Sequence, residues 1–342
     1  MQITGVDLEV LRSAVRELCR GFPNECWRGN DHNQAYPKAF VDALTEAGYL
    51  AALIPEEYGG SGLGTLEASI ILEEINRSGG NSGACHAQMY IMGSLLRHGS
   101  EEQKRRYLPK IASGELRLQS FAVTEPTTGT DSTKLKTTAV RQGDHYVING
   151  QKVFISRVLQ SDLMVLLART TPIEKVAKKS LGLSMFLVDL REAIGHGLEV
   201  RPIRTMMNHH TCELFFDRLE IPAENLIGEE GHGFHYILDG MNMERIAVAA
   251  ESIGDGYWFI DRAKAYAKDR IVFDRPIGMN QGIAFPIARA YVIVRAADLM
   301  RFFHCRHWCR NVRLFRNSGG STAKRKNRQG DTCRSFDVRS PL

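Results

Sequence analysis

A short strand that stops at a proline and a glycine, within residues 121–131, is the feature that most constrains this chain. Residues 121–124 are aromatic and β-branched, which is typical of a strand. Pro126 ends that strand because proline has no N–H for the ladder. Gly129 then allows backbone conformations closed to other residues, so the chain can approach a ligand closely. The alternative is an ordinary strand and turn that bind nothing.

A second segment, residues 146–156, carries the pair Asn149-Gly150 between two runs of β-branched and aromatic residues. Asn-Gly flanked by such runs is the strongest short-range hairpin signal, so we predict a hairpin there. Thr124 and Ser156 would then present hydroxyl donors from two neighbouring strands.

The period of the apolar residues divides the chain into helical, β and helical parts, which indicates the α+β fold class. Residues 234–268 and 281–302 have the two longest helical patterns. We therefore predict an N-terminal helical domain, a middle β-domain, an incomplete C-terminal helical domain and a disordered basic tail, over residues 1–118, 119–225, 226–303 and 304–342.

The net charge of +5 is unevenly distributed. Ten Lys or Arg against two Asp give residues 304–342 a net charge of +8, so the rest of the chain is at −3. This distribution argues against a nucleic-acid-binding protein, and no apolar run approaches the roughly 18 residues of a membrane span. Seven scattered cysteines suit a reducing compartment. The N-terminal pattern is that of an amphipathic helix, so we expect a cytoplasmic protein.

Both segments, with the order of helical and β parts, resemble the acyl-CoA dehydrogenase family over about residues 5–302. The resemblance implies an FAD enzyme that desaturates an acyl-CoA thioester between its α- and β-carbons. It also implies electron-transfer flavoprotein as electron acceptor and a homo-oligomer, tetrameric in the family. A same-fold oxidase or monooxygenase and a non-catalytic product remain alternatives.

An isoalloxazine ring needs flat apolar walls and a few donors at its edge, and the resemblance assigns these roles to residues of both segments. The residues expected at FAD are Phe121, Val123, Thr124, Gly129, Thr130, Phe154 and Ser156. Phe154 is alternatively a plain core aromatic. Three further residues match family positions that reach FAD across a subunit interface, namely Arg270, Phe273 and Gln281. Asp274 departs from the family's usual Gly, which puts that contact in doubt, and a surface salt-bridged turn is the alternative.

Glu244 falls where some family members carry the general base, at the start of an apolar stretch, residues 246–250, that we expect to be buried all round. A structural pair with Arg245 is the alternative role, and Glu251 is the competing carboxylate. By the same resemblance Thr130, Asn242 and Arg245 would contact the acyl-CoA.

The resemblance stops after Phe302, and the abrupt change of composition suggests a truncated or frame-shifted C-terminus. We therefore expect impaired activity in this chain. His304, Cys305, His307 and Cys309 have zinc-like chemistry, but no second pair follows at structural-zinc spacing, so we predict no metal.

Overall fold

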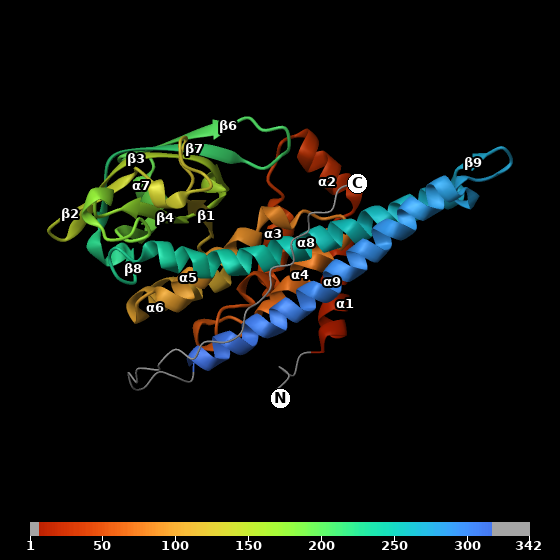
Figure 1. The fold of residues 1–342 in the computed structure, drawn as a ribbon, viewed down its shortest axis with the longest axis horizontal. Helices are drawn as coiled ribbons and strands as arrows, with labels where there is room; N and C mark the ends of the chain where they lie inside the picture. The colour runs from red at the N-terminus through yellow and green to blue at the C-terminus, as the bar shows by residue number, and fades with distance from the viewer. Residues whose placement is uncertain (1–6, 317–342) are drawn as a thin grey trace.

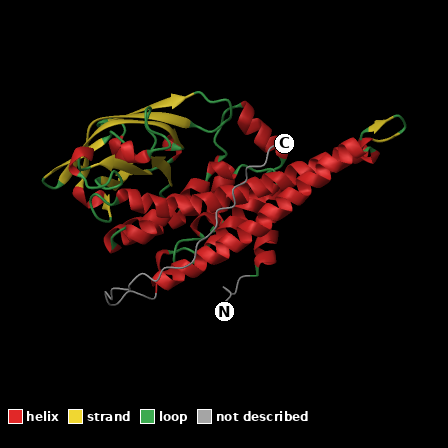
Figure 2. Cartoon of the chain, in the orientation of Figure 1, coloured by secondary structure: helices red, strands yellow, loops and turns green. Residues whose placement is uncertain are grey.

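The computed structural model describes residues 7–316, and the side chains of residues 7–301. It consists of helices at both ends of the chain and a β-sheet between them (Figures 1 and 2). The α+β class expected from the apolar period is therefore confirmed.

The N-terminal part is helical, and its helix ends follow the local signals. Its helices are α1 (Leu8–Arg20), α2 (Asn24–His32), α3 (Lys38–Glu46), α4 (Thr65–Arg77), α5 (His86–His98) and α6 (Glu101–Ser113). Pro37 lies at the N-cap of α3, and Gly48 follows its end with a positive φ of 75°. Ser100 caps α6 by accepting from the backbone N–H of Gln103, whose side chain accepts from Ser100 in return.

The middle part is one mixed sheet. Its strands are β1 (Leu118–Ala122), β2 (Thr138–Gln142), β3 (His145–Ser156), β4 (Leu163–Arg169), β5 (Leu183–Asp189), β6 (Leu198–Ile203), β7 (Thr211–Pro222) and β8 (Leu226–Ile227). Their order is β6-β7-β3-β2-β4-β5-β8, and β1 pairs in parallel with β4. The short helix α7 (Leu190–Ala193) follows β5.

The hairpin predicted at Asn149-Gly150 is wrong, because β3 runs straight through both residues. The β2–β3 turn instead lies at Gly143 and Asp144, where Gln142 pairs with His145. At Gly150 the register of β3 with β7 shifts, as in a bulge, and the Asn149 side chain accepts from the N–H of Arg218. The Asn-Gly pair therefore lies at a bulge-like register shift between two long strands, and not in a turn.

Two hydrophobic clusters hold the molecule together, and β4 contributes to both. Leu163, Val165 and Leu167 face the helices. Met164 and Leu166 face the other cluster, inside the β-domain. Alternate side chains of a strand point to opposite faces of the sheet, so this strand joins the helical core to the β-domain.

Two long helices, α8 (Gly233–Asp269) and α9 (Gln281–Arg316), form the C-terminal hairpin. Its tip carries the short strands β9 (Ile271–Val272) and β10 (Arg275–Pro276), at the end of the molecule away from the sheet (Figure 1). The prediction that this helical pattern ends at Phe302 is wrong, since α9 continues to Arg316. The rest of the predicted tail, residues 317–342, lies outside the described part. Within that part no helix is long and apolar enough to cross a membrane.

Candidate functional site

A buried ion pair and a backbone hydrogen bond join the two motif segments. Val153 N–H donates to the carbonyl of Thr124 over 2.9 Å. Lys152 Nζ donates to Glu125 Oε1 at 2.9 Å and to the carbonyl of Val123 at 3.0 Å. These hydrogen bonds fix the two segments side by side.

Burial governs the titration of this pair. Burial lowers the pKa of Lys152 to about 8, although Glu125 opposes the shift. Burial alone would raise the pKa of Glu125, but Lys152 and the N–H groups of Lys136 and Thr137 hold it below its ordinary value. Three donors, Lys152 Nζ and the N–H groups of Lys136 and Thr137, therefore keep the carboxylate ionised, and it anchors the turn that follows β1.

The side chains around this junction include donors without partners. The hydroxyls of Thr124 and Ser156 are partly buried, and neither makes a hydrogen bond to any side chain or backbone group of residues 7–301. Phe154 is 66% exposed with a positive φ of 60°, so its alternative role as a core aromatic is wrong. Phe121 and Val123 are partly buried against the helical core.

The turn after β1 is open. Gly129 and Thr130 are exposed, and a Cβ built on Gly129 would meet no atom within 4 Å. An aromatic surface, two free hydroxyls and an open turn fit the flat ring and edge acceptors of a flavin. The residues present are thus compatible with FAD at this junction.

Glu244 lies on α8, partly buried. Burial raises its pKa above the ordinary value, and Glu251 adds to the shift, while His86 and Arg245 oppose it. Arg245 donates to Asn242 Oδ1 at 2.8 Å and forms no ion pair with Glu244 within the described chain. The stretch after Glu244 is not buried all round as expected, since Val248 is 42% exposed.

Helices α5 and α8 cross closely beside Glu244. A Cβ on Gly240 would lie 2.9 Å from Ser94 Oγ and 3.4 Å from the carbonyl of Tyr90. At the other end of the contact, His86 Nδ1 lies 2.7 Å from Glu251 Oε1. The helices are therefore antiparallel here, and Tyr90, between Ser94 and His86, falls beside the turn of α8 that carries Glu244.

Sequence reasoning missed His86 and Tyr90. The helix predicted there began at Met89, whereas α5 begins at His86. Their spacing of four residues, one helical turn, was the available signal, because side chains so spaced share a face. The spacing alone does not show whether this face of α5 contacts α8.

A polar cavity of about 400 Å³ adjoins this contact, and Glu251 is in its wall. Arg157, 2% exposed, also lines the cavity, with its Nη1 unpartnered among the described residues. Burial lowers the pKa of His209 in the same wall to about 4, helped by the nearby Arg157, so this imidazole is neutral at pH 7.

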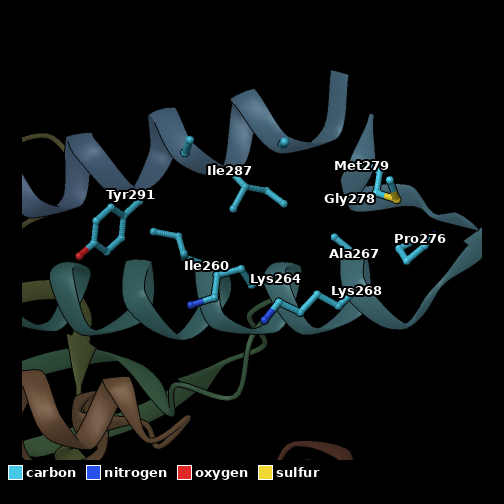
Figure 3. A pocket seen from close by; sticks show the side chains of 11 residues that line it. Ile260, Lys264, Ala267, Lys268, Pro276, Gly278, Met279, Ile287 and Tyr291 are labelled. Carbon is cyan, nitrogen blue, oxygen red and sulfur yellow. The ribbon is translucent and has the colours of Figure 1, made fainter. Parts of the chain in front are cut away.

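Arg270, Phe273 and Gln281 lie at the tip of the α8–α9 hairpin, and the fold does not bring them to the motif junction (Figure 1). Phe273 is 92% exposed, and both it and Asp274 have positive φ angles. A larger cavity, about 650 Å³, lies near this tip between the two helices (Figure 3). It is lined by residues such as Ile260, Ile287 and Tyr291, and by none of the predicted site residues.

Comparison with known proteins identifies the family. Models of the N-terminal, middle and C-terminal domains of acyl-CoA dehydrogenase match residues 6–115, 120–219 and 231–323. The chain is 33% identical to an acyl-CoA dehydrogenase of Bacillus subtilis, over 85% of this chain and 78% of that protein. It is 35% identical to the glutaryl-CoA dehydrogenase of Desulfococcus multivorans, over 86% and 76%.

Solved structures agree with the sequence comparison. A glutaryl-coenzyme A dehydrogenase in complex with glutaryl-CoA superposes with a TM-score of 0.81 at 31% identity, over 89% of this chain and 78% of that one. The butyryl-CoA dehydrogenase of Megasphaera elsdenii superposes with a TM-score of 0.79 at 26% identity, over 88% and 79%. The chain belongs to the acyl-CoA dehydrogenase family of flavoprotein oxidoreductases.

Proposed function

We propose that this protein removes the α-proton and the β-hydrogen of an acyl-CoA thioester, with FAD bound at the junction of the two motif segments. The observation that carries the proposal is the hydrogen bond from Val153 N–H to the Thr124 carbonyl. It brings Thr124 beside β3, the strand that carries Phe154 and ends at Ser156. When bound, FAD would accept the β-hydrogen as hydride.

Glu244 is the proposed general base. A base must be ionised to accept the α-proton, and its efficiency rises as its pKa approaches the working pH. Burial moves the pKa of Glu244 in that direction. The absence of an ion pair with Arg245 in the described chain leaves the carboxylate available for the substrate proton.

The remaining predicted residues fall into two groups, one proposed to contact FAD and the other the acyl-CoA. Thr124, Ser156, Phe121, Val123 and Phe154 would hold the ring of the FAD, with Gly129 and Thr130 in the open turn beside it. Asn242 and Arg245, held together by their own hydrogen bond, would contact the CoA part of the substrate, as would Thr130.

Arg270, Phe273 and Gln281 require a second subunit for any contact with FAD, because the hairpin tip lies away from the motif junction of the same chain (Figure 1). We therefore include a homo-oligomer in the proposal. The proposed electron acceptor is an electron-transfer flavoprotein. This class of protein is named in the description of a solved structure from Acidaminococcus fermentans, to which the chain is 29% identical.

The test has two stages. The visible spectrum of the purified chain, after incubation with FAD and desalting, should show bound flavin. Butyryl-CoA, octanoyl-CoA or glutaryl-CoA added without oxygen should then bleach the flavin absorbance. A protein that takes up no FAD contradicts the cofactor, and bound flavin that none of the three thioesters bleaches contradicts the reaction.

An oxidase is the second candidate, favoured by the likeness to the prolyl acyl carrier protein oxidase AnaB, at 25% identity and a TM-score of 0.78. Admitting air to the bleached protein discriminates between the two. Slow return of the flavin absorbance supports the dehydrogenase, whereas return within seconds supports the oxidase.

A further inference from the structure

We propose that His86 and Glu251 form a positioning dyad for Glu244, in which the imidazole held by Glu251 keeps the Glu244 carboxylate ionised. The proposal rests on the proposed function, because it assigns a task to residues beside the proposed base. It concerns only residues of α5 and α8.

The contact between the two residues is the first observation. His86 Nδ1 and Glu251 Oε1 are 2.7 Å apart, a hydrogen-bonding distance, and both side chains are largely buried. Glu251 is 8% exposed as a whole residue. A buried carboxylate needs a partner, and in this structure His86 supplies it. With an ionised Glu251, which can only accept, the same bond fixes the plane of the ring and places a proton on Nδ1.

The register of the helices is the second observation. Ser94 lies against Gly240, and His86 against Glu251, so α5 and α8 run antiparallel between these points. Glu244 lies between Gly240 and Glu251 on α8, and Tyr90 lies between Ser94 and His86 on α5. Tyr90 packs edge-on against the His86 ring, with the ring centroids 5.5 Å apart. The dyad and the proposed base therefore share one helix crossing.

The charges around Glu244 indicate how the dyad would act on the ionisation of this carboxyl group. The charged groups that act on Glu244 are His86 on α5 and Arg245 and Glu251 on α8. The other titratable groups around Glu244 and the dyad are Tyr90, Cys85, His209 and Asp255. Glu251 alone would repel a second carboxylate on the same side of α8, because like charges disfavour each other's ionisation. His86 lies against Glu251 and offsets that repulsion. Removing His86 would leave Glu251 uncompensated beside the base.

A matched pair elsewhere in the same crossing provides the control. His98 of α5 bonds Asp239 of α8, with Nε2 and Oδ2 2.8 Å apart. The chemistry and the helices are the same, but this pair is not among the groups that shift the pKa of Glu244. A variant of His98 therefore disturbs the packing between α5 and α8 without touching the charges beside the base.

The first experiment needs no catalysis. The full chain is labelled with ¹³C at glutamate side-chain carboxyls, the Glu244 signal is identified by its loss in Glu244→Gln, and its titration is followed by NMR. His86→Gln should move the Glu244 midpoint up by about one pH unit. The double variant His86→Gln/Glu251→Gln should move it less, because the repelling carboxylate is gone. His98→Gln should leave it in place. The proposal is overturned if the titration midpoint of Glu244 does not change in His86→Gln, or if it changes by the same amount in His98→Gln.

The ring itself supplies a second measurement if His86→Gln does not fold. ¹⁵N shifts of the His86 ring in the unaltered chain should show a protonated Nδ1, and Glu251→Gln should change the tautomer. An imidazole whose Nδ1 carries no proton overturns the dyad.

Turnover then tests the role in the reaction. The acidic limb of kcat/KM against pH, with butyryl-CoA or octanoyl-CoA and a dye acceptor, should move with the NMR midpoint. A midpoint that moves while the limb does not overturns the role in catalysis. An unaltered chain that binds FAD but turns over no thioester contradicts the proposed function, whereas the NMR result still decides the dyad.

Discussion

Lys152 donates a hydrogen bond to Glu125 across 2.9 Å in the interior of the protein, and this contact ties the strand that leads into the open turn to the strand that ends at Ser156. Lys152 is fully buried and Glu125 nearly so. The pair therefore couples the stability of the β-domain to the geometry of the proposed cofactor site.

Lys152→Met should destabilise the protein by about 3–5 kcal/mol, because it leaves the buried Glu125 carboxylate without its cation. Lys152→Met/Glu125→Gln should recover part of that loss, since no charge remains buried, although the single amide oxygen keeps only one of the two backbone donors, Lys136 and Thr137, which bond different carboxylate oxygens. Urea unfolding measures both. Arg201→Met, which breaks an exposed pair with Glu199, is the control and should cost less than about 1 kcal/mol. A Lys152→Met variant as stable as this control would show that the buried pair contributes little.

Glu244→Gln should reduce the rate of flavin bleaching by acyl-CoA at least about a hundredfold, as expected when a positioned base is lost. The FAD spectrum should be unchanged, because Glu244 lies on α8 and not on the motif strands. Stopped-flow absorbance with octanoyl-CoA measures the rate. Glu229→Gln, an exposed carboxylate before the same helix, is the control. Bleaching that continues at the original rate in Glu244→Gln would remove this residue from the mechanism.

The pH dependence of kcat/KM should have an acidic limb above the ordinary glutamate range of about 4.3. Burial raises the pKa of Glu244, so the carboxyl becomes protonated, and unable to accept a proton, at a higher pH than a solvated glutamate. Activity is thus present above that pKa and is lost as the pH falls through it. Initial rates with a dye acceptor test this, with circular dichroism confirming the fold at each pH. A limb at or below the ordinary range would contradict the assignment.

Thr124→Val and Ser156→Ala should each weaken FAD binding by up to about tenfold, because one hydrogen bond contributes about 0.5–1.5 kcal/mol. Both hydroxyls lack partners within the described side chains, so their loss costs the folded protein little. Quenching of flavin fluorescence on titration of FAD into the flavin-free protein measures the affinity. Thr138→Val removes a hydroxyl that already bonds the Asn149 carbonyl, and serves as the control. Equal affinities in all three variants would place the FAD elsewhere.

The sequence predicted strands at both motif segments but did not predict the helix crossing. Ser156 ends β3 as predicted, whereas the strand predicted over residues 121–124 ends at Ala122, so Thr124 lies two residues beyond β1. The pairing of His86 with Glu251 joins residues 165 positions apart. Helical periodicity gives a face to each helix but does not say which faces meet, so this contact could not be derived.

Two local predictions failed, one at Asn149-Gly150 and one at the end of the last helix. Asn149-Gly150 has the residues of a tight turn, but the long pairing of β3 with β7 on both sides keeps the strand extended through it. The end assigned to the last helix at Phe302 followed the loss of apolar periodicity, whereas the backbone of α9 continues to Arg316. At Asn149-Gly150 the local turn signal was weaker than the strand pairing around it.

Gly254→Ala should destabilise the protein, because α8 passes so close to α4 that an added Cβ would lie 2.3 Å from the carbonyl oxygen of Glu73. A backbone atom cannot move aside as a side chain can, so the helices must separate, at a cost of roughly 1–3 kcal/mol or more. Gly93→Ala on α5 is the matched control. Its Cβ would meet nothing within 4 Å, and alanine in a helix interior is favoured over glycine by about 1 kcal/mol, so this variant should be slightly more stable. Thermal unfolding of the two variants in parallel separates the effects. If Gly254→Ala unfolds at the temperature of the unaltered chain, α8 does not need this close approach, and the position of Glu244 beside α5 would have to be secured by the remaining contacts of the crossing.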